Sequence, residues 1–284
     1  MSPWRRAVCV VPFAFVVVLA TARPAEAEKD YEPLFDHFNF RLEGSLVQMA
    51  TEIRLDSEEL GLGTTLDFED DLDLDGSKLI PSLSFEWQIA RRHKLGVRWQ
   101  DISRDSTAQA LEEIQWGDEV IPVGADVFLA FDITQYFVDY AYYPWVKERW
   151  AAGFGLGVRV MEIATILEWE SGELASSGSS DVEGTGPLPY LYFEYRRLLA
   201  DQWRFRTGLG WLAVEVEDIE GSQWVGKLDI EYLAGRRWGF GAALNFARVD
   251  VNWAGLEASG GEELYTGAID MDIGDVSIFA RVRF

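Results

Sequence analysis

Histidine and cysteine are scarce in this sequence: its 284 residues include 2 His and 1 Cys. The lone cysteine, Cys9, cannot form an internal disulfide, so a disulfide-stapled fold is excluded. Only His37 and His93 could serve as a histidine base or a metal ligand. Catalysis that depends on histidine or cysteine therefore has very few candidates.

Basic residues are also few, with 25 Lys and Arg against 48 Asp and Glu, and the formal net charge is −23. A chain this acidic repels the phosphate backbone, which excludes nucleic acid as the main partner. The hydrophobic fraction is 48%, enough for a sizeable buried or lipid-facing surface. Disorder along the whole length is therefore excluded as well.

Residues 1–27 have the three parts of a cleavable signal peptide. Two arginines precede a 14-residue apolar run at 7–20, and Ala25-Glu26-Ala27 has the small-x-small pattern that signal peptidase cuts. A membrane anchor helix is the alternative, but this run is shorter than the ~20 residues that span a bilayer. We therefore predict an exported mature chain, residues 28–284, which forms one domain, lacks Cys9 and has a net charge of −25.

The mature chain has a dominant hydrophobic period of two, which is the period of β-strands. Two strands change phase midway, between Leu46 and Met49 and between Ile133 and Tyr136, and we expect a β-bulge at each place. We predict about ten strands, with eight or twelve as alternatives, at residues 37–55, 79–90, 95–104, 126–143, 149–169, 188–198, 202–214, 225–234, 238–253 and 265–284.

Short and long connections alternate along the chain. The tight turns are at residues 91–94, 144–148, 199–201 and 235–237, and the longer loops are at residues 56–77, 105–125, 170–187, 215–224 and 254–264. An up-and-down closed sheet has this pattern, with all tight turns at one end and all long loops at the other.

The two faces of the expected strands differ in chemistry. Strand ends beside the tight turns are rich in Trp and Tyr, which is typical of the aromatic girdle at a lipid interface. The face opposite the apolar one has many charges, which suit a polar lumen: Glu86, Arg98, Arg159, Glu194, Arg204, Arg206, Asp229, Glu231, Arg281 and Arg283. Opposite charges could pair across such a narrow interior.

The last strand alternates and ends on an aromatic residue, with Val276, Ile278, Ala280, Val282 and Phe284 on one face. This resembles the C-terminal assembly signal of Gram-negative outer-membrane β-barrel proteins. The signal peptide, the loop alternation and the girdle extend the resemblance over the mature chain, and the strand and loop sizes are similar to small porin-like barrels of the OmpW and OmpA-transmembrane type.

The resemblance implies an all-β, up-and-down antiparallel transmembrane β-barrel in the bacterial outer membrane, with short periplasmic turns and long acidic extracellular loops. It also implies a monomer that contacts outer-membrane lipid and lipopolysaccharide and meets the barrel-assembly machinery through its last strand. The alternative is a soluble periplasmic lipocalin-like binding barrel, in which the apolar face points inward around a core or ligand.

The five long loops hold 25 acidic residues and no Lys or Arg. In the first loop, Asp67, Glu69 and Asp70 could form a vestibule that concentrates cations. The following Asp71, Asp73 and Asp75 copy the opening of a calcium-binding EF-hand loop, but the twelfth position is Ser82 and no flanking helices are expected. A weakly bound Ca²⁺ or Mg²⁺ is one interpretation, a solvated acidic loop is the other, and no further cofactor is expected.

These features favour a narrow, passive, cation-preferring pore. The alternative is a non-conducting barrel that serves as a structural or surface-binding element, through lipopolysaccharide, divalent cations or adhesin-like loops. Enzymes of the resembling family, such as omptin proteases, depend on a histidine near the outer rim. Because His37 and His93 both belong to the expected periplasmic end, we predict that the protein is not an enzyme.

Overall fold

The computed structural model describes residues 33–56, 63–116, 119–172, 176–216, 219–257 and 264–284. The expected signal peptide, residues 1–27, lies outside these ranges and stays a prediction. Within the described ranges, no helix has both the length and the apolar character needed to cross a membrane.

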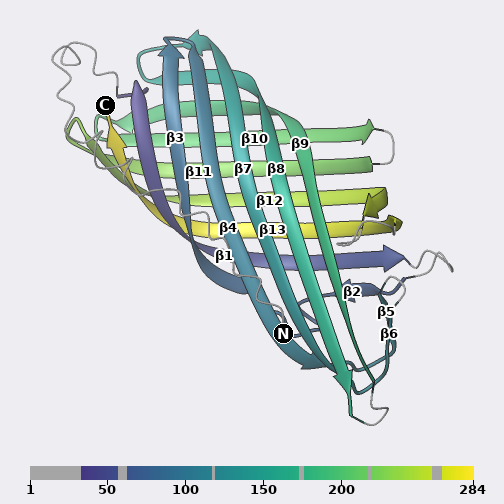
Figure 1. The fold of residues 1–284 in the computed structure, drawn as a ribbon. Coiled ribbons are helices and arrows are strands. Elements are labelled where there is room, and N and C mark those ends of the chain that lie inside the picture. The colour runs from purple at the N-terminus through teal and green to yellow at the C-terminus, as the bar shows by residue number, and fades with distance from the viewer. Residues whose placement is uncertain (1–32, 57–62, 117–118, 173–175, 217–218, 258–263) are drawn as a thin grey trace. The chain divides into compact units, whose positions relative to one another are not determined.

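The strands of the described residues pair into a closed antiparallel ring of ten, as the sequence predicts (Figure 1). Each strand pairs with the next along the chain, and β13 returns to pair with β1. The ring strands are β1 (Phe38–Asp56), β3 (Ser77–Ala90), β4 (His93–Gln109), β7 (Asp126–Val146), β8 (Trp150–Ser171), β9 (Ser176–Ala200), β10 (Trp203–Val216), β11 (Ile219–Ala234), β12 (Trp238–Glu257) and β13 (Leu264–Arg283).

Three short strands lie beside the ring. β2 (Thr65–Asp67) pairs with β1 near its end, and β5 (Ile114–Trp116) forms a separate hairpin with β6 (Glu119–Ile121). We call the end of the ring with the tight turns the turn end, and the opposite end the loop end. Three of the expected loops are shorter than predicted, because β9, β10, β11, β12 and β13 continue into residues 176–187, 215–224 and 254–264.

The two predicted β-bulges, one on β1 and one on β7, are wrong. The pairing of β1 with β13 runs without a shift from Asn39↔Arg283 to Asp56↔Thr266, so the same face of β1 points inward throughout. Near the turn end the inward residues are polar, whereas from Val47 onward they are mostly apolar. The apolar residues change sides because the surroundings of the strand change, while the backbone register is kept.

The same inversion occurs on the other long strands. On β7, Gln135 and Asp139 face inward at one level, while Phe131 and Ile133 face inward nearer the loop end. The pairing of β4 with β7 is continuous across this point. On the outside the change is reciprocal, and β13 passes from Val276 and other apolar residues to aspartates. The ring is therefore apolar outside toward the turn end and apolar inside toward the loop end.

Aromatic pairs mark the two borders of the apolar exterior. On β10 and β11, Trp203 lies 5.3 Å from Tyr232 near the turn end, and Trp211 lies 5.7 Å from Trp224 further along. Trp203 and Trp211 are eight residues apart, which at ~3.3 Å per residue and ~40° tilt corresponds to about 20 Å across the membrane. This height is close to that of the lipid-facing band of an outer-membrane barrel.

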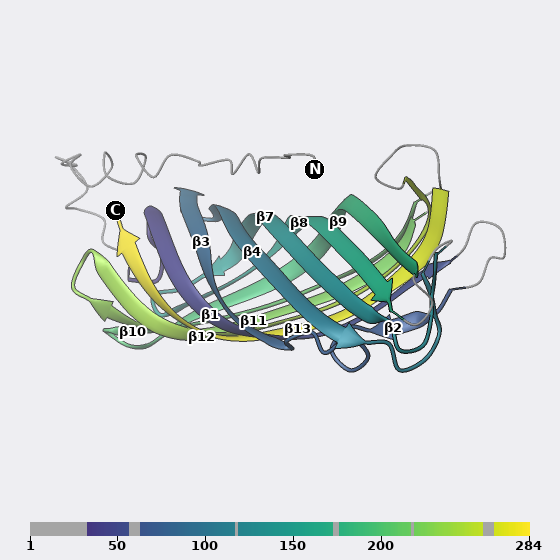
Figure 2. The same ribbon diagram turned by 60° about the horizontal axis from the view of Figure 1, so that its bottom comes forward.

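Beyond this band the strands separate into two groups (Figures 1 and 2). The pairing of β9 with β10 ends at Trp211↔Leu191, and that of β3 with β4 ends at Ser82↔Gln100. One group is β4, β7, β8 and β9, and the other is β10 to β13 with β1. Both groups turn apolar side chains toward the space between them.

A hydrophobic core fills that space. Phe68, which follows β2, lies edge-on to Phe131 of β7 at 5.3 Å and within 6.1 Å of Trp116 of the β5–β6 hairpin. Leu129 and Met271 reach the core from opposite groups of strands and are fully buried. The first loop and the hairpin thus complete a core that the ring strands begin.

Candidate functional site: the barrel lumen

The N-terminal segment before β1 occupies the lumen at the turn end. Leu34 and Phe35 are buried, and the Phe35 ring lies 5.1 Å from that of Tyr143. The guanidinium of Arg204 donates hydrogen bonds of 3.2 Å to the carbonyl oxygens of Pro33 and Leu34. The segment is therefore anchored inside the ring by both apolar and polar contacts.

Next to this segment lies a buried cluster of opposite charges. Arg204 of β10 contacts Asp36 at 2.8 Å and Glu231 of β11 at 3.0 Å. Arg281 of β13 contacts Asp36 at 3.1 Å and also pairs with Glu231. Arg283 reaches Asp36 at 3.4 Å. Buried ions need such partners, because an unpaired buried charge is strongly destabilising.

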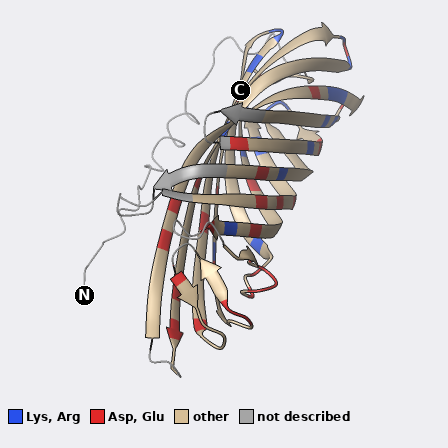
Figure 3. Cartoon of the chain, turned by 90° about the vertical axis from the view of Figure 1, so that its right-hand side faces the viewer, with Lys and Arg blue, Asp and Glu red and all other residues tan. Residues whose placement is uncertain are grey.

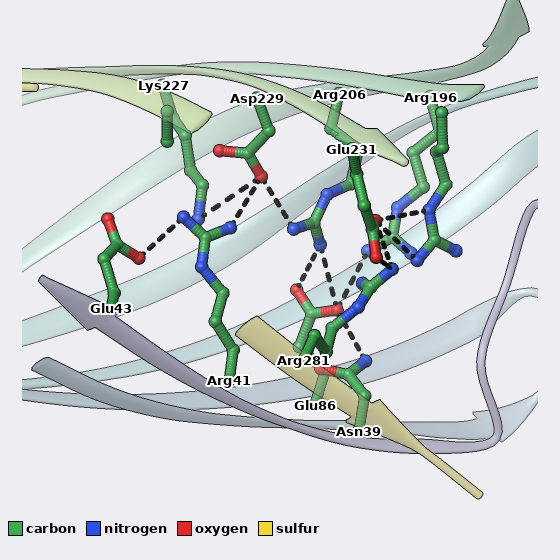
Figure 4. A network of polar contacts seen from close by, with 12 residues as sticks. Asn39, Arg41, Glu43, Glu86, Arg196, Arg206, Lys227, Asp229, Glu231 and Arg281 are labelled. Atoms are coloured by element: carbon green, nitrogen blue, oxygen red, sulfur yellow. Dashed lines mark hydrogen bonds and ion pairs between the residues drawn. The ribbon is translucent and has the colours of Figure 1, made fainter. Parts of the chain in front are cut away.

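A second cluster continues the network toward the loop end (Figure 4). Arg206 contacts Asp229 at 2.6 Å and Glu86 at 3.1 Å, which joins β10 and β11 to β3 across the lumen. Arg41 of β1 then links Asp229, at 2.9 Å, to Glu43, at 2.6 Å. These cross-lumen pairs place side chains across the path that an ion would follow.

Glu194 of β9 is the centre of a third cluster. It pairs with Lys94 of β4 and with Arg196, and the Tyr143 hydroxyl donates a 2.7 Å hydrogen bond to it. The Arg196 guanidinium also lies 5.6 Å from the centre of the Tyr143 ring. Charge pairing and a cation–π contact therefore hold this part of the wall together.

The structure places every predicted lumen charge in the interior. Most of them enter the three clusters, whereas Arg98 and Arg159 do not. Sequence analysis missed six charged members of the clusters: Asp36, Arg41, Glu43, Lys94, Arg196 and Lys227. All but Asp36 lie on strands at alternate positions, which the period of two can identify.

Between the charged clusters and the hydrophobic core lies a cavity of about 160 Å³. Its wall includes Arg98, Arg159 and the Phe137 ring between them. Asp139 and Asp275 also line it, and each bonds to a neutral group: the Tyr190 hydroxyl donates to Asp139, and the Asn245 amide donates to Asp275 at 2.8 Å.

The first-loop acids have more than one orientation. Glu69 turns inward, where it pairs with buried Arg104 of β4 and accepts a 2.7 Å hydrogen bond from the Thr51 backbone. Asp67 caps the turn that follows it, and its carboxylate accepts hydrogen bonds from the backbone amides of Glu69 and Asp70. Of the expected vestibule, Asp70 is thus the residue whose side chain is solvent-exposed and has no hydrogen bond or ion pair among the described residues.

The three aspartates expected to bind metal lie in a hydrogen-bonded turn that follows β2. Asp71 accepts a 2.8 Å hydrogen bond from the Asp67 backbone amide, and Asp73 has a left-handed backbone with φ of 52°. Within the described ranges, no group of three or more His, Cys, Asp or Glu side chains is arranged to hold a metal ion. The site expected at Asp71, Asp73 and Asp75 stays a prediction.

The two histidines lie at the turn end. His93 begins β4, where its Nδ1 is 2.6 Å from the Tyr140 hydroxyl on the outer face of β7. His37 lies beside the start of β1, with its ring 4.4 Å from that of Phe38. The acidic loops lie at the other end, and Figure 3 shows them in red from that side. Neither histidine is near the surface that the loops form.

Comparison with known proteins supports an outer-membrane fold. No protein-family description and no curated protein matches the chain. Among solved structures, the outer membrane protease OmpT from Escherichia coli is similar with a TM-score of 0.58 at 10% identity, over 87% of this chain and 96% of that one.

Two further similar structures have lower TM-scores. The outer membrane protein OprG from Pseudomonas aeruginosa has a TM-score of 0.40 at 11% identity, over 88% of this chain and 97% of that one. The toluene transporter TodX from Pseudomonas putida has a TM-score of 0.37 at 8% identity, over 88% of this chain and 91% of that one. The similarity to OmpT, an outer membrane protein, agrees with the expected location. The chain has the fold of the outer-membrane β-barrels.

Proposed function

We propose that the protein is a non-conducting outer-membrane barrel whose working surface is its acidic loop end. The observation that carries this proposal is the filling of the lumen. The N-terminal segment, the charged clusters and the hydrophobic core follow one another along the barrel axis. This arrangement favours the non-conducting alternative over the cation-preferring pore expected from the sequence.

The hydrophobic core blocks the axial path of an ion from the loop end, and the charged clusters block the lumen below the gap between β9 and β10. Phe131 and Leu129 are fully buried in it, and Trp116 closes it from the hairpin. An ion that crossed this layer would leave water for an apolar environment, at a cost far above thermal energy. Small barrels of ~8 strands are filled by side chains, whereas porins of ~16 strands keep an aqueous channel. Ten strands place this barrel near the filled end of that range.

In this proposal, the acidic loops are the part of the barrel that contacts other molecules at the cell surface. Divalent cations held by the loop carboxylates could bridge the barrel to the phosphates of lipopolysaccharide, so lipopolysaccharide is the partner that this surface fits best. The loops hold 25 acidic residues and no Lys or Arg, which makes them unsuited to bind the anionic lipid directly. OmpT is a protease, but no such activity is proposed for this chain, because its two histidines lie at the turn end.

Planar-bilayer conductance tests the proposal. Mature protein is refolded in detergent, and its folding is checked by a different gel mobility before and after boiling. We expect no discrete conductance steps. Steps with cation preference that disappears when the six first-loop acids are neutralised would restore the pore, and these acids are Asp67, Glu69, Asp70, Asp71, Asp73 and Asp75.

The surface role is tested with the barrel reconstituted in supported phospholipid bilayers that lack lipopolysaccharide. Soluble lipopolysaccharide is passed over the reconstituted barrel with Mg²⁺ or with EDTA. We expect binding in Mg²⁺ and release in EDTA, and weaker binding when Asp70 is replaced together with Asp73 and Asp75 by Asn. Binding that ignores both EDTA and the substitutions would contradict the cation-bridged contact.

A further inference from the structure

The mid-lumen cavity has the room and the groups of a ligand site. Its volume of about 160 Å³ is roughly 11 to 16 times the ~10–15 Å³ that a cavity needs to hold one water molecule. The hydrophobic core closes it on one side and the charged clusters on the other. The absence of a side chain at Gly157 of β8 leaves space for the Tyr190 ring in the cavity wall, because a Cβ there would lie 2.3 Å from that ring.

Two arginines of the cavity differ from the other buried cations of the lumen. Arg98 and Arg159 approach the Phe137 ring, with their guanidinium carbons 4.0 and 5.3 Å from its centroid. Among the described residues, neither arginine has a carboxylate within ion-pair distance. In contrast, Arg41, Arg204 and the other clustered arginines each have one.

Arg159 has donors without acceptors, as do Arg41, Arg206 and Arg281, but those three also pair with a buried carboxylate, which Arg159 lacks among the described residues. It is 1% exposed, and its Nη2 donates a 2.8 Å hydrogen bond to Gln135 Oε1. Its Nε and Nη1, and the amide nitrogen of Gln135, are buried without a partner among the described residues. The buried Tyr192 hydroxyl at the same cavity also has none. Buried polar groups are nearly always satisfied, so these donors indicate an acceptor from outside the chain.

The carboxylates of the cavity do not fill this role. Asp139 is bonded to Tyr190 and Asp275 to Asn245, and the other three carboxylates of the wall pair with cations of the charged clusters: Glu86, Glu194 and Asp229. Their presence has a second effect, because their negative charge disfavours a doubly charged anion in the same cavity. A singly charged anion can pair with the arginines at a smaller repulsive cost.

We propose that this cavity binds a small organic monocarboxylate. Its carboxylate oxygens accept hydrogen bonds from Arg159 and Gln135, since the guanidinium fork matches the geometry of a carboxylate. Its apolar part lies against Phe137 and the tyrosine rings of β9. The ligand enters near Gly210, because β9 and β10 stop pairing one residue beyond it, at Trp211↔Leu191.

Calorimetric titration of the folded barrel in a non-ionic detergent tests the site. The probes are sodium acetate, sodium propionate and inorganic phosphate, each compared with sodium chloride at equal ionic strength. We expect saturable binding of acetate and propionate, with propionate the tighter because of the aromatic wall, and no binding of chloride.

The variant Arg159→Gln should weaken propionate binding about tenfold or more, since it removes charge-assisted hydrogen bonds. The variant Arg248→Gln is the matched control and should bind as the parent does, because the Arg248 side chain is exposed on the outer face of β12, where it pairs with Asp270. If Arg159→Gln does not fold, as shown by the same gel mobility before and after boiling, Arg98→Gln takes its place with the same expectation.

Three results would overturn the proposal. The first is no saturable binding of any probe, which leaves the donors to water. The second is equal propionate affinity in the parent and in the folded arginine variant. The third is tighter binding of phosphate than of both carboxylates, because it would contradict the singly charged ligand.

Discussion

An arginine placed on the outer face of β8 should destabilise the barrel at Leu156 and leave it nearly unchanged at Ile166. Both side chains point outward on the same strand and are exposed on the bare protein, 61% and 39% respectively. Leu156 lies within the apolar band that begins at Trp150, whereas Ile166 lies beyond Glu162, where the exterior has become polar. The two sites differ in the solvent that they meet.

The expected costs follow from that difference. Arginine on the lipid face of a barrel near the bilayer midplane costs about 2–4 kcal/mol, so Leu156→Arg should lower the equilibrium constant for folding roughly 30- to 700-fold. A surface substitution in water is usually within ~0.5 kcal/mol, so Ile166→Arg should change stability by no more than that. Leu156→Met, which conserves volume, is the control for disturbed packing.

Equilibrium unfolding in guanidinium chloride measures both values. The mature barrels are refolded into phosphatidylcholine vesicles, and tryptophan fluorescence reports unfolding through the 11 tryptophans of residues 28–284. Linear extrapolation gives the free energies of unfolding if the slopes agree. Equal costs at Leu156 and Ile166 would refute the reasoning, since they would mean that the inversion of polarity does not mark the membrane border.

Four other substitutions, one of them with a control variant, test separate parts of the structure. Phe131→Ala should lower the free energy of unfolding by about 3–5 kcal/mol in the same assay, and a loss below ~1 would contradict a packed core. Glu231→Ala removes the partner of two buried arginines and should cost about 3–5 kcal/mol, whereas Arg149→Ala, from the exposed pair with Asp201, should cost under ~1. Gly157→Ala should destabilise by about 1–3 kcal/mol through overpacking against Tyr190, and an unchanged midpoint would show that the ring can move aside. Phe284→Ser should reduce the assembled protein in outer-membrane fractions without reducing export, because Phe284 closes the ladder to Phe38 with a 2.9 Å backbone bond; equal levels would count against the terminal signal.

The strands and their order in the ring could be predicted from the amino-acid sequence alone. Alternation is a local property, since neighbouring side chains on a strand point to opposite faces whatever the strand packs against. The period of two in residues such as Val276 to Phe284, with the alternation of turns and loops, was enough to predict ten antiparallel strands and an apolar exterior. The inward positions of Arg204, Glu231 and Arg281 follow from the same pattern.

Alternation alone does not tell whether the apolar residues at a given level of the barrel face outward to lipid or inward to a protein core. The folded structure is needed to distinguish the two. A change of phase at Leu46 and Met49 is equally consistent with a bulge or with a straight strand that leaves lipid for water. The unbroken register of β1 with β13 decides for the straight strand. The packing of the buried side chains also reveals the hydrophobic core beyond the lipid-facing band, which alternation alone could not distinguish from a lipid-facing surface.

The partners of the buried charges could not be predicted from the sequence, for a related reason. Glu231 meets Arg204 on the neighbouring strand and Arg281 two strands away, and Glu69 of the first loop turns inward to Arg104. These contacts depend on strand stagger and on how a loop folds back into the barrel. Both are set by long-range packing, because the energy of a buried ion pair depends on positions that no local pattern encodes.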